Sequence, residues 1–446
     1  MKILLIQPPF NSNLIGGGIL YMNEPLALEA IGAVVPEHKV KLLDMRVDQN
    51  LEHELSNFQP DIVGITAYTT DVYVANDILK KVKNHNKDIL TVVGGHHASL
   101  LPEDFYKEFV DVIVVGEGQY TFRELVYAYE ENRSFESVDG LILNIDGTVR
   151  ATRERKLENN LDRFPFPDRN LTKEYRNCYF RASWRPVATV ITSRGCPYRC
   201  NFCSVWKLQD GKYRTRSPEN VLEEILTIEE DYISISDDNF LQDIPRATKI
   251  YELIKKSGMK KKFKVVGRTD VVAKNPDIIE KWKEIGLEMV VLGLESIRDE
   301  ELKWLNKKTT VKTNEEAINV LNKNNIKVIG QFIIHPEYTY DDFEALFEYI
   351  QKTNISHPLF TILTPLPRTE LYYQKEGQLL TRNYEMFDLA HCVLPTKLPR
   401  EEFHKCFADL LVKCYSNQAN PDSALIPKPL LQKLYSQILN GYKLLS

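Results

Sequence analysis

The sequence predicts an α/β protein in which a doubly wound parallel sheet is followed by a partial barrel of six strand-helix units and a small helical C-terminal region. Short, fully apolar runs recur along the chain, and helix-length segments fill the gaps between them. Such runs are typical of parallel strands that are buried on both faces. With 446 residues, of which 43% are hydrophobic and 27% charged, the chain can build two or three domains with substantial cores.

Residues 1–135 contain the first series of apolar runs, which we expect to form the first sheet. The expected strands are Ile3 to Gln7, Val40 to Asp44, Asp61 to Thr66, Ile89 to Val93 and Val112 to Val115. Ligands of open parallel sheets bind beyond the carboxyl ends of the strands. Glycine or proline follows three of these ends, and glycine there lets the backbone approach a ligand closely. The segments concerned are Gln7-Pro8-Pro9, Gly94-Gly95-His96-His97 and Gly116-Glu117-Gly118.

The alternation fades over residues 136–186, where we expect a linker marked by Phe164-Pro165-Phe166-Pro167. A second alternation over residues 187–383 fits a partial barrel. Its expected strands are Val187 to Thr192, Tyr232 to Ser236, Phe263 to Val266, Met289 to Leu292, Val328 to Ile333 and Leu359 to Leu363, with helical stretches such as Val221 to Glu229 and Asp277 to Ile285 between them. Residues 384–446 show helical patterns and form the expected C-terminal region.

Charge and apolar patterning argue against two kinds of partner. The 57 Lys and Arg residues against 62 Asp and Glu leave a net charge of −5, so we expect no nucleic-acid partner. The longest uncharged run, residues 3–23, contains Pro8-Pro9 and Gly16-Gly17-Gly18, which would interrupt a membrane helix, so no integral membrane segment is expected. The N-terminal apolar run is too short for a secretory signal, and we expect a cytoplasmic protein.

Three of the seven cysteines, Cys196, Cys200 and Cys203, lie within eight residues directly after the first expected barrel strand. In a reducing compartment such a group is more typical of a metal or cluster site than of disulfides. Three thiolates leave one iron of a four-iron cluster open for another ligand. A structural zinc site is the alternative, but zinc requires a fourth protein ligand, and His97 and His335 are distant in sequence. The other cysteines, which we expect to take no part, are Cys178, Cys392, Cys406 and Cys414.

The CxxxCxxC loop, with Phe202 before its last cysteine and a strand-helix barrel behind it, resembles the radical S-adenosylmethionine (SAM) superfamily. The resemblance implies a TIM-type (β/α)6 barrel, a [4Fe-4S] cluster on the three cysteines and a SAM molecule on the open iron. It places SAM against Phe202, Ser236, Asp237, Arg268, Glu295, Ile333 and His335.

By that resemblance Glu295 contacts the SAM ribose, Arg268 its carboxylate and the main chain near Ile333 to His335 its adenine. Helix capping is the alternative role for Asp237 and its neighbour Asp238. His335 departs from the family pattern, because relatives usually carry a small residue there.

The preceding domain is similar to the Rossmann-like cobalamin-binding class of this superfamily, on the strength of Gly94-Gly95-His96-His97-Ala98, Leu101-Pro102-Glu103 and Val115-Gly116-Glu117-Gly118. The resemblance implies cobalamin-binding by Pro8, Gly94, Gly95, His96, Gly116, Glu117 and Gly118. The loop from Asp44 to Asn50 lacks the His and Gly of the cobalt-ligating DxHxxG motif, so we expect no histidine ligand from it. No GxGxxG follows the first strand, which argues against a dinucleotide.

Together the resemblances imply a cobalamin-dependent radical SAM enzyme. We expect foremost a methyltransferase that moves a methyl group from methylcobalamin to an unactivated carbon after hydrogen abstraction by a 5′-deoxyadenosyl radical. The substrate would be a small molecule or lipid, and the electron donor a protein such as flavodoxin or ferredoxin. Radical rearrangement, oxidation or cyclisation, for instance of a tetrapyrrole, is the enzymatic alternative, and a cobalamin-binding or redox-sensing module is the non-enzymatic one. Because reacting atoms must come within ~3 to 3.5 Å, we expect the strand ends of both domains to share a cavity.

Overall fold

The computed structural model describes residues 1–19, 21–145, 147–181, 183–416 and 426–445, and the chain forms two compact units. Unit 1 consists of Met1–Leu14, Glu24–Cys178 and Asn383–Glu385. Unit 2 consists of Ile15–Asn23, Tyr179–Arg382 and Met386–Ser446. Each unit is therefore assembled from three separate stretches of the sequence.

Unit 1 is built on one sheet with the strand order β3-β1-β4-β5-β6-β7-β8. Its strands are β1 (Lys2–Gln7), β3 (Lys39–Asp44), β4 (Ile62–Thr66), β5 (Leu90–Gly94), β6 (Val112–Val114), β7 (Leu141–Ile145) and β8 (Thr148–Ala151). The strands from β3 to β6 run parallel. All five strands expected in residues 1–135 are confirmed, each to within one residue at either end. The strand order reverses at β1, and ligands of such sheets bind at that switch point.

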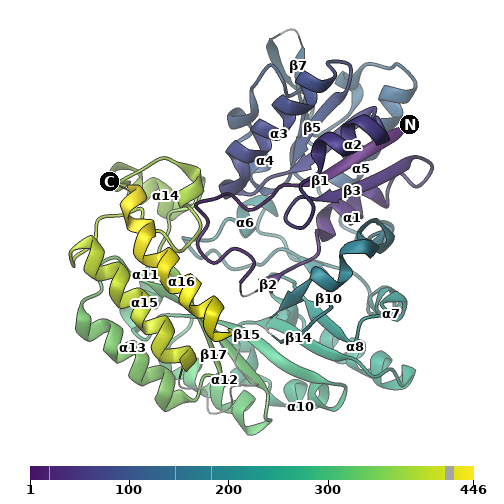
Figure 1. The fold of residues 1–446 in the computed structure, drawn as a ribbon. Coiled ribbons are helices and arrows are strands. Elements are labelled where there is room, and N and C mark those ends of the chain that lie inside the picture. Colours follow the sequence, from purple (N-terminus) through teal and green to yellow (C-terminus); the bar gives the residue numbers. More distant parts are fainter. Residues whose placement is uncertain (20, 146, 182, 417–425, 446) are drawn as a thin grey trace. The chain divides into compact units, whose positions relative to one another are not determined.

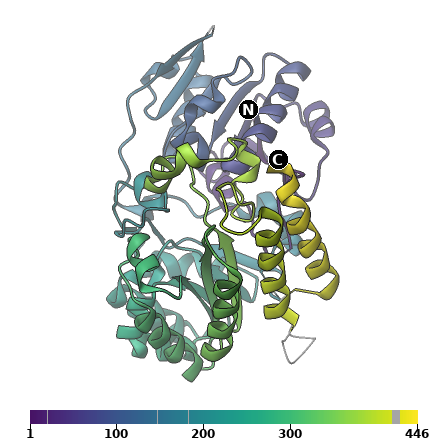
Figure 2. The ribbon, with the colours of Figure 1, turned by 90° about the vertical axis from the view of Figure 1, so that its left-hand side faces the viewer.

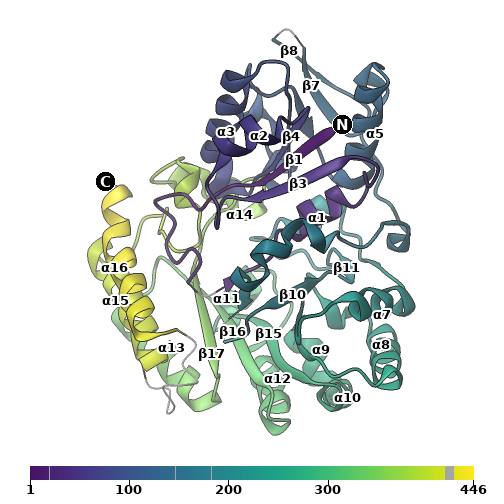
Figure 3. The same ribbon diagram turned by 45° about the vertical axis from the view of Figure 1, so that its right-hand side comes forward.

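Helices cover both faces of this sheet (Figures 1 and 3). Apolar side chains of α2, α3 and α4, such as Leu55 and Ile78, pack on one face. Those of α1 and α5, such as Leu28 and Phe122, pack on the other. The helices are α1 (Leu26–Gly32), α2 (Leu51–Phe58), α3 (Val72–His85), α4 (His96–Leu100) and α5 (Gly118–Glu130), with short 3-10 helices at Thr69–Asp71, Pro102–Phe105, Phe135–Ser137, Leu161–Arg163 and Arg169–Cys178.

The segment expected to be a linker, residues 136–186, differs from the expectation. Strands β7 and β8 form a hairpin that pairs antiparallel with β6 and extends the sheet. The sheet of unit 1 is therefore mixed rather than wholly parallel. Every residue of β8 is exposed, so the strand carries no apolar pattern by which it could be recognised.

The 3-10 helix Arg169–Cys178 also belongs to unit 1, where ion pairs hold it. Arg169 lies 3.1 Å from the carboxylate of Glu24 and 3.5 Å from that of Glu29, and Arg176 pairs with both carboxylates. Both glutamates are buried, and Thr172 donates a hydrogen bond of 2.5 Å to Glu29. The segment thus packs on the unit through these buried polar contacts together with an apolar one, since Leu171 packs against the core.

Unit 2 contains a parallel sheet whose six strands follow one another in sequence order, as expected for a partial barrel. The strands are β10 (Val187–Val190), β13 (Tyr232–Ile235), β14 (Lys262–Gly267), β15 (Leu287–Glu295), β16 (Lys327–Ile334) and β17 (His357–Ile362). Two-stranded pairs join β2 (Tyr21–Met22) to β9 (Phe180–Arg181), and β11 (Ser193–Arg194) to β12 (Arg214–Thr215). All six barrel strands predicted from the sequence are confirmed.

Helices of unit 2 pack on the outer face of this sheet (Figure 3). Trp282 belongs to the large apolar core that these helices form with the sheet, whereas Trp184, Met289 and Ile329 belong to a separate, smaller core. The helices are α6 (Val205–Leu208), α7 (Pro218–Thr227), α8 (Ile244–Ser257), α9 (Thr269–Lys274), α10 (Pro276–Glu284), α11 (Asp299–Trp304), α12 (Val311–Lys323), α13 (Tyr340–Thr353) and α14 (Glu370–Lys375), with 3-10 helices at Phe240–Gln242 and Glu376–Gln378.

The expected helical C-terminal region is confirmed. Helices α15 (Arg400–Ser416) and α16 (Lys428–Gly441) lie side by side, and α15 also contacts α13 (Figures 1 and 2). Short 3-10 helices occur at Tyr384–Met386 and Tyr442–Leu445. In the part of the chain that the structure describes, no helix combines the length and apolar character needed to cross a membrane.

The buried Glu29 carboxyl makes the stability of unit 1 depend on pH. Burial, followed by the neighbouring Glu24 charge, raises the pKa of Glu29 from its ordinary value of 4.5 to about 8. Folding therefore strengthens proton binding at Glu29. The resulting stabilisation is complete below pH 4.5 and is lost as the pH rises through about 8.

We expect Glu29→Gln to remove this loss, because glutamine keeps the hydrogen-bonding shape without ionising. The Tm of the variant relative to the natural protein should rise steadily between about pH 5 and about pH 9, measured by thermal denaturation. Glu131→Gln, at an exposed carboxylate paired with Arg133, is the control and should show no such trend. A Tm difference that does not change with pH would contradict the assignment.

Candidate functional site

The cysteine loop follows the first barrel strand of unit 2. It lies between the short strand β11 and helix α6. Cys200 is buried, and Cys196 and Cys203 are half-buried. The three thiols that the sequence singled out therefore belong to one loop near the carboxyl end of β10.

Two aspartates at the end of the neighbouring strand β13 hold this loop. Asp237 accepts hydrogen bonds from the Thr192 backbone N–H, the Thr192 hydroxyl and the Ser193 hydroxyl, each at 2.6 Å. Asp238 accepts one from the Gly195 backbone N–H at 2.8 Å. Burial raises the pKa of both carboxyls. These contacts position the cysteine loop. The alternative role of helix capping is wrong, because the N-cap residues of the next two helices are Asn239 and Asp243 rather than Asp237 or Asp238.

The electrostatics of the loop suit a bound iron–sulfur cluster. Burial raises the pKa of all three thiols, that of Cys203 to about 12. Nearby positive charges act in the opposite direction but do not outweigh burial. Arg268 opposes the rise in pKa at Cys196 and Cys200, and Lys307 opposes it at Cys200. Cys203 also interacts electrostatically with Cys200 and Cys196. Among the described residues no three His, Cys, Asp or Glu side chains converge closely enough to hold a metal ion, so the fit rests on chemistry: three soft donors on one loop, with two cations nearby, suit a cluster bound through thiolates.

Arg268, which follows β14, links several parts of this site. Its guanidinium lies 3.4 Å from the centre of the Tyr198 ring. It donates hydrogen bonds to the Lys307 carbonyl at 2.7 Å and to the Asp270 carboxylate at 3.0 Å. Tyr198 donates to the same Asp270 carboxylate at 3.0 Å. Arg268 therefore ties the third strand end to the cysteine loop.

Glu295 ends β15 and forms a buried ion pair with Lys307. The Lys307 Nζ to Glu295 Oε1 distance is 2.5 Å, and both residues are buried. The pairing of β15 with β16 shifts register next to Glu295, whose φ is +62°. A Cβ at Gly293 would lie 2.4 Å from Glu295 Oε1 and 2.6 Å from Lys307 Nζ, so only glycine leaves room for this pair. Backbone strain at a carboxylate is typical of functional sites.

An apolar cluster brings together two residues that the resemblance placed against SAM. Phe202, from the cysteine loop, and Ile333, from β16, both pack against this cluster. Its buried members are Leu305, Leu363, Leu371 and Leu394. Side chains from distant parts of unit 2 thus form one apolar wall beside the cysteine loop.

The remaining residues assigned to SAM also lie at strand ends. Ser236 follows β13, and its hydroxyl lies 3.0 Å from that of Ser234. His335 follows β16, and its ring packs edge-on against Trp304 at a centroid distance of 5.5 Å. Burial lowers the pKa of His335, so its imidazole is neutral near pH 7.

Three members of this site were not expected from the sequence. Lys307 lies beside Lys308 and has the appearance of an ordinary surface lysine. Tyr198 lies inside the cysteine loop, and an aromatic residue at that position could have been recognised from the sequence as a candidate contact. Asp270 follows Arg268 by two residues, and this spacing could have indicated their ion pair.

In unit 1 the residues expected to bind cobalamin gather at the carboxyl ends of β1, β5 and β6. Pro8 is buried directly after β1, and Gly94 ends β5. Gly95 has a φ of +101°, a conformation that favours glycine. The Ser99 hydroxyl donates to the Gly95 carbonyl at 2.8 Å and accepts from the Gly116 N–H at 3.0 Å. Ser99 thus holds two neighbouring strand ends together.

The two histidines after β5 have different surroundings. His96 stacks on Tyr68 at a ring-centroid distance of 5.8 Å, and burial lowers its pKa to about 4, so it is neutral near pH 7. His97 is fully buried, with Nδ1 at 3.1 Å from the Thr69 hydroxyl and Nε2 at 2.8 Å from Asp104. Because both ring nitrogens of His97 are engaged, it has a structural role.

The other expected cobalamin residues lie at the start of α5. Gly118 begins this helix, and Glu117 accepts a hydrogen bond from the Glu158 backbone N–H at 3.2 Å. Glu117 lines a pocket of about 240 Å³ together with Tyr120, Arg155, Lys156, Leu157, Glu158, Asn159 and Phe164. After β3, both carboxylate oxygens of Asp44 accept hydrogen bonds from Arg46, at 2.8 and 2.7 Å. The Asp44 carboxylate thus forms its hydrogen bonds within its own loop.

Comparisons with known proteins match both parts of the chain. The model of the Radical SAM superfamily matches residues 190–350, and that of the B12 binding domain matches residues 13–126. The chain is 31% identical over 417 residues to the hopanoid C-3 methylase of Methylococcus capsulatus, across 91% of this chain and 78% of that protein. It is 32% identical over 451 residues to an uncharacterized methyltransferase of Pyrococcus horikoshii, across 98% of this chain and 95% of the relative.

A solved structure shares the fold. The structure of OxsB, a cobalamin-dependent S-adenosylmethionine radical enzyme with aqua-cobalamin and S-adenosylmethionine bound, matches with a TM-score of 0.72 at 19% identity, over 100% of this chain and 72% of that chain. The chain belongs to the radical SAM superfamily, in the branch of cobalamin-dependent enzymes that join a B12 binding domain to the radical SAM domain.

Proposed function

We propose that the protein is a methyltransferase that places a methyl group on an unactivated carbon of a small molecule or lipid. The cysteine loop carries this proposal, since Asp237 and Asp238 hold it at the carboxyl edge of the barrel in a chain that also has a B12 binding domain. The names of both relatives describe methyl transfer, which favours it over rearrangement, oxidation or cyclisation.

The residues of unit 2 bind and orient the cofactors. When bound, the cluster and SAM supply a radical that removes hydrogen from the substrate, and cobalamin supplies the methyl group. Cys196, Cys200 and Cys203 hold the cluster. Glu295 offers carboxylate oxygens to the ribose hydroxyls, and Arg268 faces the carboxylate of SAM.

The apolar cluster beside the cysteine loop serves adenine binding and water exclusion. Phe202 and Ile333 supply apolar contacts to the adenine, and the main chain up to His335 supplies polar ones. Ser236 lies beside SAM, whereas Asp237 acts through the loop that it holds. The leucines of the cluster keep water from the radical.

Unit 1 binds cobalamin at the strand ends beside the switch point. Gly94, Gly95 and Gly116 allow close approach of the backbone, while Pro8, Glu117 and Gly118 complete the rim. Neutral His96 lies at the same edge of the sheet, and no cobalt ligand comes from the Asp44 loop. Methyl transfer requires both cofactors to reach one substrate.

The cluster also requires an electron donor, for which a flavodoxin or ferredoxin is suitable. We further propose a cytoplasmic location, because a reducing compartment preserves the loop cysteines as thiols for cluster assembly.

One anaerobic experiment tests the proposed reaction class. The protein is reconstituted with iron, sulfide and hydroxocobalamin, and then incubated with dithionite and SAM that carries deuterium in its methyl group. We expect 5′-deoxyadenosine to form and the recovered corrinoid to carry the labelled methyl, as measured by mass spectrometry. A radical rearrangement, oxidation or cyclisation enzyme would form 5′-deoxyadenosine without labelling the corrinoid, and a sensing module would do neither.

The cysteine assignment predicts a selective loss of iron. Cys200→Ala removes one of three cluster ligands, so the iron content of anaerobically purified protein should fall from about four per chain to near zero. Cys406→Ala, at a half-buried cysteine on α15, is the control and should retain all the iron. Equal iron contents in the two variants would show that the cluster lies elsewhere.

The Glu295–Lys307 pair predicts the effect of a change in charge at Glu295. Glu295→Gln removes a charged acceptor for the ribose hydroxyls, so the Kd for SAM should rise about tenfold, a loss of about 1.4 kcal/mol. Equilibrium dialysis on protein with a full iron content measures this Kd. The matched control is Glu288→Gln on the same strand, where the carboxylate lies 2.8 Å from Lys262. We expect unchanged binding there, and comparable weakening in both variants would contradict the assignment.

A further inference from the structure

We propose that a basic pocket on unit 2 is the docking site for an acidic carrier protein that delivers single electrons to the cluster. The pocket has a volume of about 350 Å³. Its lining residues come from α9, the end of α11, the loop after it and the start of α12, and they are Asp270, Lys274, Lys303, Asn306, Lys308, Thr309, Thr310 and Thr313. The inference rests on the proposed function, because it requires a cluster on the cysteine loop.

The wall of the basic pocket is bonded directly to the cysteine loop. The Asn306 side chain donates a hydrogen bond of 2.6 Å to the Arg199 carbonyl. The Asn201 side chain donates one of 2.8 Å to the Trp304 carbonyl. Arg199 and Asn201 are the residues on either side of Cys200 in sequence. A partner seated in the pocket would therefore contact the segment that carries the cysteine loop.

A second connection runs through Asp270, which lines the basic pocket. Its carboxylate accepts a hydrogen bond from the Tyr198 hydroxyl at 3.0 Å, inside the cysteine loop. The same carboxylate pairs with Arg268 at 3.0 Å. Two opposite parts of the lining thus meet the loop, which makes the pocket a short route from the surface to the cluster.

The charge of the basic pocket selects the kind of partner. Lys274, Lys303 and Lys308 are exposed, and among the described residues none of the three has a carboxylate within salt-bridge distance. The single acidic lining residue, Asp270, is neutralised by Arg268. The pocket is therefore positive on a chain whose net charge is −5. Such a patch attracts a negatively charged protein and accelerates its association.

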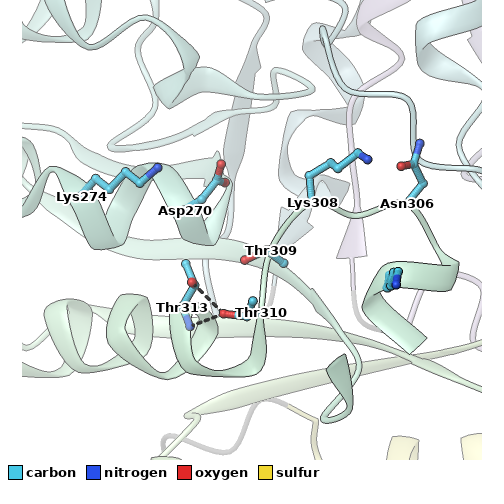
Figure 4. A pocket seen from close by; sticks show the side chains of 8 residues that line it. Asp270, Lys274, Asn306, Lys308, Thr309, Thr310 and Thr313 are labelled. Carbon is cyan, nitrogen blue, oxygen red and sulfur yellow. Dashed lines mark hydrogen bonds between the residues drawn. The ribbon is translucent and has the colours of Figure 1, made fainter. Parts of the chain in front are cut away.

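The arrangement of the lysines fits a protein surface better than a small anion. Lys274 and Lys308 lie on either side of Asp270 and do not point toward one another (Figure 4). A small anion is held best by donors that converge on it. Trp304, next to Lys303, is 38% exposed and offers an aromatic contact of the kind that is enriched at protein interfaces.

The proposed step is a transfer of one electron. The reduced carrier, a flavodoxin or ferredoxin, is oxidised by one electron and the cluster is reduced by one. No covalent bond forms or breaks in this step, and no proton moves. The chain's contribution is to hold the carrier against the cysteine loop.

The test uses the full-length protein and purified flavodoxin, with the Kd measured by microscale thermophoresis. In the variant K274E/K303E/K308E we expect the Kd to rise at least tenfold at low salt, because the attractive charges become repulsive. The milder variant K274Q/K303Q/K308Q should give an intermediate Kd. Reduction of the cluster by flavodoxin, followed by its absorbance, should slow in parallel, whereas reduction by dithionite should not change.

The matched control is K256E/K260E/K323E, which alters three exposed lysines outside the basic pocket. Its Kd for flavodoxin should equal that of the natural protein. The proposal is overturned if the pocket variant binds flavodoxin normally, if the control loses binding equally, or if dithionite reduction also slows. It is likewise overturned if the pocket variant loses binding of inorganic phosphate while flavodoxin binding is unchanged. Failure of the proposed function appears separately, as natural protein that forms no 5′-deoxyadenosine with dithionite.

Discussion

The chemistry of unit 2 depends on the hydrogen bonds by which Asp237 and Asp238 hold the cysteine loop. Strands β10 and β13 are parallel neighbours, so the carboxylates at the end of one lie beside the loop at the end of the other. Asp237 is almost fully buried, and burial disfavours its charge. Three donors from Thr192 and Ser193 compensate for this, and losing one such donor would cost about 1 to 3 kcal/mol. The pairing of β10 with β13 therefore determines the position of the cysteine loop.

The Glu295–Lys307 pair shows how burial and function are balanced in the same unit. A buried ion pair contributes little net stability, because desolvation offsets much of the attraction. Its value here is orientation, since the strained backbone at Glu295 and the space left by Gly293 hold both charges at the strand end. Lys307 also acts on Cys200, so one lysine influences both the carboxylate and the thiol.

The parts of the protein that were predictable are those with a local signal. Buried parallel strands appear as continuous apolar runs, which is why every strand expected in the two sheets is present. The exposed strand β8 has no such apolar run, so the β7–β8 hairpin was not predicted and its residues were assigned to the linker. The role of Asp237 depends on Thr192, 45 residues away in sequence, and becomes visible only once β10 and β13 are paired. Lys307 was missed because nothing local distinguishes it from its exposed neighbour.

The division of unit 1 into three stretches has a consequence for its biosynthesis. Tyr384 packs against His97 at a ring-centroid distance of 5.0 Å, and Glu385 accepts a hydrogen bond from Asn13. Between Cys178 and these residues the ribosome must first translate Tyr179–Arg382, which takes roughly 10 to 40 s at typical elongation rates. Unit 1 therefore acquires its last native contacts, those of Tyr384 with His97 and of Glu385 with Asn13, only after the whole barrel has been translated.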